Sequence, residues 1–194
     1  MSLRAAQKQM TYDLFLEKAL QLFGEKGYNA TTVDHIAAAA GSTRTTFYLH
    51  FPGGKAEVMA ALLGKVDTIL TSADDPPLAE VVASGSRELI HAWIELKFSQ
   101  WDEIKPYLTA SYQATHEAAV VERTESWFEH AVGEMTTGLE SAGRFEPDVR
   151  RARCVLAFGQ LEYLSRRYYA TGWKISREVF LEELTDSWVH LLTE

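Results

Sequence analysis

The sequence predicts an all-α protein, with an N-terminal unit of three helices followed by a longer C-terminal helical body. Three observations lead to this fold class. Apolar residues recur at helical spacings along nearly the whole chain, strand-like alternation is absent, and no Asn-Gly or Asp-Gly hairpin turn occurs. Glycine and proline breaks divide the periodic stretches, so we expect several separate helices.

The composition is that of a soluble globular protein, with 46% hydrophobic and 24% charged residues among 194. No apolar stretch approaches the roughly 20 residues that span a bilayer. The polar residues 1–10 lack the apolar centre of a secretory signal. Cys154 is the only cysteine, which rules out an internal disulfide. We therefore expect a cytoplasmic protein with no membrane segment.

The charge is distributed unevenly along the chain, whose net charge is −8. Residues 1–55 carry six Lys or Arg and four Asp or Glu, a net +2, whereas the remainder carries 13 and 23, a net −10. An acidic body with a mildly basic head indicates that only the head approaches a polyanion.

The N-terminal unit divides into three expected helices. The first covers 11–26 and stops at Gly27, because glycine tolerates the left-handed conformation that follows many helix ends. Thr31 is the expected N-cap of the second helix, with Asp34 three residues on in a capping-box-like spacing. Thr43 is the expected N-cap of a short third helix.

The remaining helices are expected after a break at Pro52-Gly53-Gly54. A fourth helix covers about 55–70, and 71–77, with two prolines, is linker-like. Pro106 is expected near a helix start. We place a helix-turn-helix domain at 1–55 and the body at 56–194, with helices in the body at about 78–101, 104–115, 116–141, 147–171 and 176–192.

The stretch 31–51 meets the needs of a helix-turn-helix. Such a motif requires two short helices joined by a tight turn, the second exposing polar residues and keeping an apolar back. Small alanines permit close helix packing, Gly41 supplies the turn, and Phe47 and Phe51 point into the core. An ordinary helix pair in a bundle is the alternative that spacing alone leaves open.

One set of short segments runs through the N-terminal unit: Phe23-Gly24-Glu25-Lys26-Gly27-Tyr28, Thr31-Thr32-Val33, Ile36-Ala37, Ala40-Gly41 and Thr46-Phe47-Tyr48-Leu49-His50-Phe51. Through these segments, residues 11–63 resemble the TetR family of one-component transcriptional regulators. Three features depart from the family pattern: Ser42 at a commonly apolar turn position, Thr45 where glycine is common, and a loop one residue longer before Lys55.

The resemblance implies sequence-specific binding to double-stranded DNA through the third helix. Arg44 can pair with O6 and N7 of guanine, the commonest specific base contact. Lys55, at the start of the fourth helix, is placed to hold a phosphate. The full set of expected DNA contacts is Thr32, Thr43, Arg44, Thr45, Thr46, Tyr48, His50 and Lys55.

The resemblance further implies that the body binds a small-molecule effector. Its aromatic side chains supply apolar area, and a few polar groups, Gln113 among them, could orient a ligand. We expect the effector to be small and largely apolar, and to release a repressor from its operator. The expected lining is Trp93, Trp101, Tyr112, His116, Trp127, Phe158 and Glu162.

The last two helices are expected to join a homodimer, which would bind a palindromic operator. The helix at 147–171 is apolar around much of its circumference, from Val155 to Leu161, and therefore needs burial on several sides. The final helix carries an apolar face made of Leu181, Leu184, Trp188 and Leu191.

Two other classes of function are weighed against a regulator. Glu88 and His91 have the Glu-x-x-His spacing of a helical di-iron enzyme, but no second such pair occurs. We therefore expect no catalytic residue, metal or cofactor. A non-specific architectural DNA binder is disfavoured because the body is acidic and basic arms are lacking.

Overall fold

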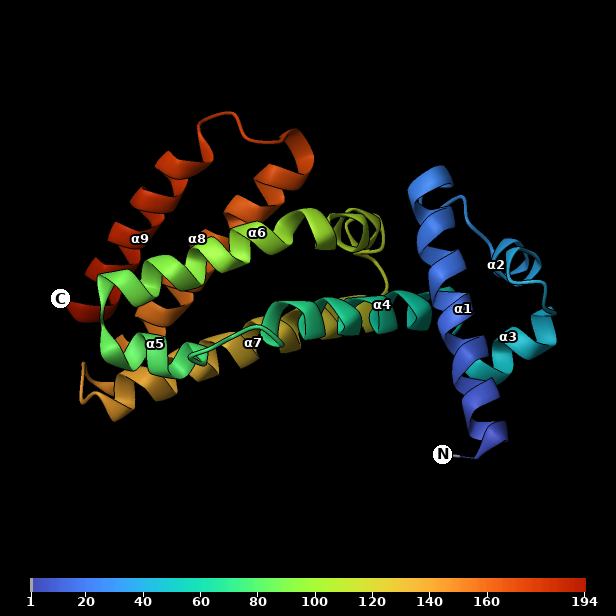
Figure 1. Ribbon diagram of the computed structural model, residues 1–194, viewed down its shortest axis with the longest axis horizontal. Helices are drawn as coiled ribbons and strands as arrows, with labels where there is room; N and C mark the ends of the chain where they lie inside the picture. The colour runs from blue at the N-terminus through green and yellow to red at the C-terminus, as the bar shows by residue number, and fades with distance from the viewer. Residues whose placement is uncertain (1) are drawn as a thin grey trace. The chain divides into compact units, whose positions relative to one another are not determined.

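The computed structural model describes residues 2–194, and within them it has nine helices and no strand (Figure 1). The all-α prediction is confirmed. Among the same residues, no helix combines the length and the apolarity that crossing a membrane requires. The helices are α1 (Leu3–Lys26), α2 (Val33–Ala39), α3 (Arg44–His50), α4 (Gly54–Thr71), α5 (Leu78–Ser84), α6 (Arg87–Ser111), α7 (Ala118–Ser141), α8 (Pro147–Thr171) and α9 (Arg177–Thr193).

The chain divides into two compact units. The first holds the chain up to Thr68 together with Ile104–Thr124, and the second holds Ile69–Glu103 and Glu125–Glu194. The first unit therefore extends past the sequence-predicted boundary at residue 55. The reason is packing, because the core around α1 to α3 also contains apolar side chains of α4, α6 and α7, namely Val58, Met59, Leu62, Leu63, Ala110 and Val120.

Aromatic side chains form the centre of the first unit. Phe15 of α1, Phe47 of α3 and Phe51, which follows α3, are all fully buried. The ring of Phe15 meets the ring of Phe47 edge-on with 5.3 Å between centroids, a preferred geometry for an aromatic pair. The inward direction predicted for Phe47 and Phe51 is confirmed.

The start of α2 differs from the sequence prediction. The N-cap is Thr32, whose hydroxyl accepts from the backbone N–H of His35, and the His35 ring completes the capping box. Thr31 is instead buried, and its hydroxyl is within 2.8 Å of the Gly27 carbonyl oxygen, to which it donates. Asp34 therefore takes no part in the capping box, although its spacing predicted that role.

The middle of the chain also departs from the predicted helices. One helix was expected over 78–101, but Gly85 adopts a left-handed conformation (φ +65°) and separates α5 from α6. Pro106 lies inside α6 and not at a helix start. Proline removes one backbone hydrogen bond from a helix. Burial of Trp101, Ile104 and Ala110 on both sides of it keeps α6 continuous.

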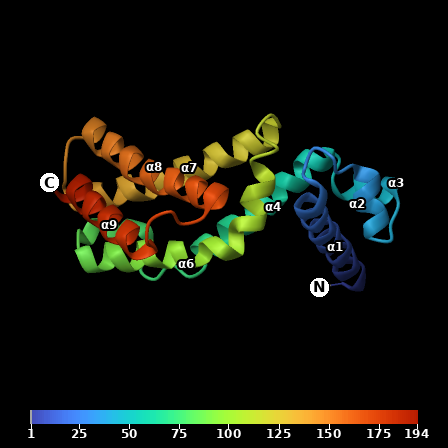
Figure 2. The same ribbon diagram turned by 90° about the horizontal axis from the view of Figure 1, so that it is seen from above.

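In the second unit, α8 and α9 lie side by side (Figures 1 and 2). Trp188 of α9 is fully buried, donates from its indole N–H to the Ala157 carbonyl at 2.9 Å, and stacks on Trp93. Leu181 and Leu184 are buried beside it in the same chain. The apolar face of α9 was expected to meet a partner subunit, and that assignment is wrong for Leu181, Leu184 and Trp188 because this chain's own core buries them.

Candidate nucleic-acid interface

A tight turn joins α2 to α3. After α2 the chain passes through Gly41, whose φ is +60°, and the backbone N–H of Ser42 donates to the Ala37 carbonyl at 2.9 Å. Thr43 then caps α3, its hydroxyl accepting from the Thr46 N–H at 3.1 Å. The N-cap predicted at Thr43 is confirmed. Ser42 takes part in the turn through its backbone, so a polar side chain at this position leaves the turn geometry intact.

The outer face of α3 is open to solvent while its inner face is buried. Thr43, Arg44 and Thr45 are exposed, whereas Phe47 is buried. The Thr43 and Thr46 hydroxyls hydrogen-bond to each other at 2.9 Å, so both are partly used in capping the helix. Arg44 and Thr45 are therefore the exposed side chains at the start of α3 that take no part in capping the helix.

Arg44 is held by two neighbours. Its Nη1 donates to Oδ2 of Asp34 on α2 at 2.9 Å, and its guanidinium carbon lies 5.5 Å from the centre of the Tyr48 ring. All three side chains are exposed, that of Tyr48 least so. Asp34 on α2 and Tyr48 on the next turn of α3 therefore restrain the side chain of Arg44, the residue expected to contact a base.

His50 lies at the end of α3 against α1. Its ring centroid is 5.7 Å from that of Phe15 and 6.4 Å from that of Tyr12, and its buried Nδ1 has no hydrogen-bond partner among the described residues. Burial, and secondarily the charge of Lys8, lower the pKa of the imidazole below its ordinary value. No local pattern indicates this internal packing, because it depends on residues of another helix, Phe15 and Tyr12 of α1.

Lys55, on the first turn of α4, has an internal partner. Its Nζ donates to the Tyr28 carbonyl at 2.8 Å and lies 4.1 Å from the centre of the Tyr28 ring. Burial lowers the pKa of this ammonium, an effect opposed by the charge of Glu117. The fully buried Tyr28 in turn donates its N–H to Gln113 and its hydroxyl to Glu117, both at 2.9 Å.

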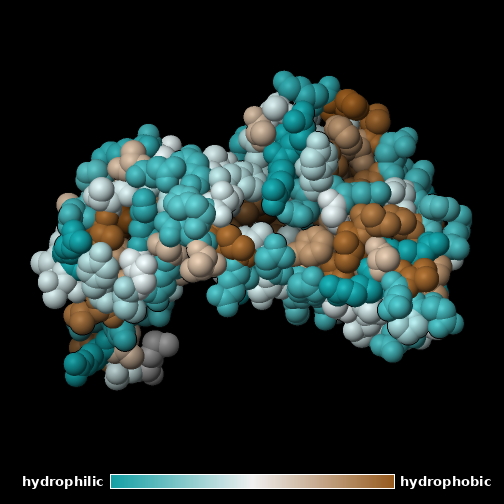
Figure 3. All heavy atoms as spheres, turned by 180° about the vertical axis from the view of Figure 1, so that it is seen from behind, coloured by the Kyte–Doolittle hydropathy of each residue, from teal (hydrophilic) through white to brown (hydrophobic). Residues whose placement is uncertain are grey.

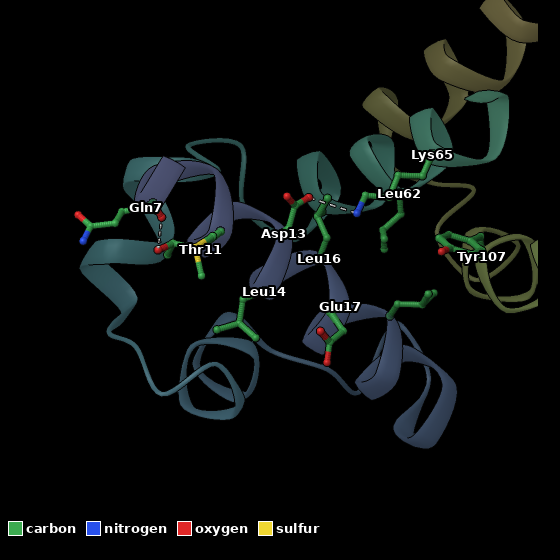
Figure 4. A pocket seen from close by; sticks show the side chains of 11 residues that line it. Gln7, Thr11, Asp13, Leu14, Leu16, Glu17, Leu62, Lys65 and Tyr107 are labelled. Atoms are coloured by element: carbon green, nitrogen blue, oxygen red, sulfur yellow. Dashed lines mark hydrogen bonds and ion pairs between the residues drawn. The ribbon is translucent and has the colours of Figure 1, made fainter. Parts of the chain in front are cut away.

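The residues expected to line an effector cavity are distributed over both units. Tyr112 and His116 belong to the first unit, and the other five belong to the second. His116 is exposed, with Nε2 3.6 Å from Oε1 of Glu117. Gln113 is engaged with the Tyr28 backbone. The first unit also has an open hollow of its own between α1 and α4, next to Tyr107, with the Asp13–Lys65 ion pair on its wall (Figure 4).

The four aromatic residues of this set in the second unit pack against other aromatic side chains. Trp127 contacts Phe158 with ring centroids 5.0 Å apart, and Trp101 stacks on Trp173 at 5.5 Å. Trp93 is buried against Trp188. Glu162 pairs with Arg166 one helical turn later, at 2.8 Å.

Two exposed residues of the motif were not singled out from the sequence. Asp34 was assigned to a cap, and its contact with Arg44 becomes visible only when α2 and α3 are placed together. Leu49 was passed over as part of the family signature, yet its side chain is 74% exposed on α3. An apolar side chain in that position can contact the methyl group of thymine. The helical pattern itself could have indicated Leu49, since it lies one turn after Thr45.

Comparison with known proteins identifies the family. The family model described as bacterial regulatory proteins, tetR family, matches residues 15–62, which include the whole of α2, the turn and α3. The HTH-type transcriptional regulator TtgW of Pseudomonas putida is 32% identical over 101 residues, covering 50% of this chain and 75% of that protein. This chain belongs to the TetR family. That family consists of transcriptional regulators and not enzymes, which decides against the di-iron alternative.

Other relatives match over a smaller share of their length. SrpR of Pseudomonas putida is 32% identical over 101 residues, half of this chain and 47% of that regulator. YuxN of Bacillus subtilis is 34% identical over 73 residues, a quarter of its length. The chain thus spans between a quarter and a half of the length of these two regulators.

Solved structures of similar fold extend over nearly the whole chain. NalD, the secondary repressor of the MexAB-OprM multidrug efflux pump in Pseudomonas aeruginosa, superposes with a TM-score of 0.71 at 20% identity, covering 96% of this chain and 98% of NalD. The fatty acid degradation regulator FadR from Bacillus halodurans gives 0.61 at 19% identity, covering 93% and 94%. At these identities the likeness establishes the TetR fold.

Proposed function

We propose that this TetR-family chain is a sequence-specific DNA-binding repressor that a small, largely apolar effector releases from its operator. The observation that carries the proposal is the α2–turn–α3 motif, which has a buried apolar back and an exposed face around Arg44. A helix of this kind enters the major groove with its N-terminal residues against the base edges. NalD, which has the same fold, is a repressor.

Within this proposal the expected DNA-contact residues divide into two roles. Arg44, with Thr43, Thr45 and Thr46 beside it, reads bases, because an arginine fork matches O6 and N7 of guanine. Phosphate contacts fall to side chains at the edges of the motif and fix the protein on the duplex without reading sequence. These are Thr32, Tyr48, His50 and Lys55.

A homodimer is part of the proposal, and α8 offers the surface for it. Val149, Leu156 and Tyr163 are spaced seven residues apart, so they lie on one face of the helix. They are exposed, Leu156 to 59% and Tyr163 to 66%. Hydrophobic side chains are also prominent on the surface of the second unit in Figure 3. An apolar stripe left in water favours a partner surface, and two identical subunits would recognise a palindromic operator.

The effector belongs, in this proposal, to the aromatic part of the second unit. Trp93, Trp101, Trp127 and Phe158 supply apolar area there, and Glu162 supplies a charged group that could orient a ligand. An effector that binds better to the conformation unable to hold DNA lowers operator affinity by that difference in affinity. Tyr112 and His116 belong to the first unit and stay predictions from the sequence alone.

Selection of bound sequences from random duplex DNA tests the proposal most directly. The full-length protein should enrich one imperfect palindrome with half-sites about one helical turn apart, roughly 34 Å. Tight but sequence-independent binding with a steep salt dependence would instead support the architectural alternative. With the operator in hand, a ligand screen followed by tryptophan fluorescence and by release of DNA then tests the effector site.

A further inference from the structure

Asp34 places a carboxylate on the surface that meets DNA in the proposed function. We propose that Asp34 is a positioning residue, which orients Arg44 for base reading and so raises selectivity while lowering affinity for DNA in general. The inference rests on the proposed function and adds to it a residue that determines specificity. It concerns the pair formed across the motif, from the first turn of α2 to the first residue of α3.

The contact fixes one edge of the guanidinium and leaves another edge available. Asp34 Oδ2 accepts from Nη1 of Arg44 at 2.9 Å, and among residues 2–194 the structure gives Arg44 no other hydrogen bond. Guanidinium has five donors in a rigid fork. With Nη1 turned toward Asp34, the edge formed by Nε and Nη2 keeps the two parallel donors that pair with guanine O6 and N7.

The Tyr48 ring restrains the same group from another direction. The guanidinium carbon lies 5.5 Å from the ring centre, within the range of a cation–π contact. Two restraints from different elements limit the rotamers of a long side chain that is 59% exposed. Fixing the side chain before binding reduces the conformational entropy that base recognition would otherwise cost.

The charge of Asp34 acts against binding in general. Its side chain is 63% exposed on a surface proposed to approach phosphates, and a carboxylate is repelled by them. The Asp34–Arg44 pair is neutral as a unit, so Arg44 adds little to the attraction that any duplex exerts. A matched sequence can offer Arg44 its guanine partner, whereas a random sequence offers no such compensation.

The substitution Asp34→Asn removes the charge and keeps the shape of the side chain. The cap of α2 depends on Thr32 and His35, so its hydrogen bonds remain. We expect affinity for random duplex to rise. The ratio of operator affinity to random affinity should fall by about two- to five-fold for each half-site, the range that corresponds to an exposed ion pair.

The experiment measures dissociation constants on operator and random duplexes across a salt series, for the full-length wild type, Asp34→Asn, Arg44→Ala and the double variant. If Asp34 acts through Arg44, Asp34→Asn leaves the affinity ratio unchanged in the Arg44→Ala background. Glu25→Gln is the matched control, because it removes an exposed carboxylate of α1 bonded to Gln21. It should leave the ratio at the wild-type value.

Two results overturn the inference. Asp34→Asn could strengthen binding to both duplexes equally, which would make Asp34 a source of repulsion alone. The ratio could also fall in the Arg44→Ala background, in which case Asp34 would itself contact a base. Both results presuppose an operator found by selection. Failure to enrich any sequence would refute the proposed function instead, and the two failures are therefore distinguishable.

Discussion

Lys55 and His50 both contact other residues inside the first unit, so their substitution should affect stability as well as DNA binding. Lys55 holds the Tyr28 carbonyl and covers its ring. Lys55→Ala should therefore lower the free energy of unfolding by about 1–2 kcal/mol, since it removes a charged hydrogen bond and a cation–π contact from a partly buried site. Denaturant unfolding of the wild type and the variant gives the value, with Lys18→Ala on α1 as the control.

The same variant also tests the phosphate contact. Loss of one phosphate contact per protomer should weaken binding to operator and random DNA alike. It should also reduce the slope of log affinity against log salt concentration by about one unit per contact. A reduced stability combined with an unchanged salt slope would show that Lys55 serves the fold and contacts no phosphate.

His50 should make stability depend on pH. Burial lowers the imidazole pKa in the folded state below the ordinary 6.5, so on acidification the unfolded chain takes up a proton first. The free energy of unfolding is then highest above pH 6.5 and decreases as the pH falls through the window between the two pKa values.

Comparison with His50→Gln isolates this effect from the other histidines. Urea unfolding at a series of pH values from 8 to about 5 should show a shallower dependence for the variant than for the wild type. Equal slopes would mean that the His50 imidazole has the same pKa in the folded and the unfolded protein.

At the level of the elements, the turn between α2 and α3 depends on one backbone conformation. Gly41 has φ +60°, and a Cβ added there meets no atom within 4 Å. Gly41→Ala should thus cost about 1–2 kcal/mol through backbone strain alone, because no clash contributes. Gly41→Asn should cost less, since asparagine tolerates the left-handed region.

Thermal unfolding of the two variants checks this ordering, and operator binding measured well below Tm checks the turn itself. Gly143, which also has positive φ (+63°) and open space around it, provides a control in the second unit. An Ala substitution at Gly143 should reduce stability without affecting operator affinity. Equal stability of Gly41→Ala and the wild type would contradict the strain argument.

The elements that sequence predicted well are those governed by local chemistry. The cap at Thr43, the turn at Gly41 and the inward Phe47 follow from residues within one or two helical turns, and the structure has all three. The continuity of α6 through Pro106 was missed because packing of side chains on either side overrides local propensity. The break at Gly85 was also missed, although a glycine in the left-handed conformation after a helix end is a local signal.

In the candidate site, too, local features were predicted from the sequence and contacts between distant residues were not. The pattern of residues identified the exposed face of α3, whereas the partners of Arg44, His50 and Lys55 come from other elements. Gln113 and Glu117 reach Tyr28 across 85 and 89 positions. Contacts at such separations leave no local periodicity to detect.

For the whole molecule, assembly decides whether two motifs can act on one operator. In the dimer that we propose, the exposed stripe on α8 becomes buried, with Leu156 at its centre. Leu156→Asp should convert the dimer to a monomer, because it places a charge in an apolar contact without disturbing the core of the chain. Sedimentation at micromolar concentration measures this, and far-ultraviolet circular dichroism checks that the helices persist.

Operator affinity of the Leu156→Asp variant shows whether the exposed stripe on α8 serves dimerisation or contacts a different partner. A monomer engages one half-site at a time and loses the gain that comes from linking two binding events. The Leu156→Asp variant should therefore lose far more affinity for the full operator than for an isolated half-site. Val121→Asp is the matched control, since Val121 is an exposed apolar residue that belongs to the first unit and is not part of α8. If Leu156→Asp stays dimeric and binds the full operator like the wild type, the subunits associate through another surface, and the exposed stripe on α8 requires a different partner.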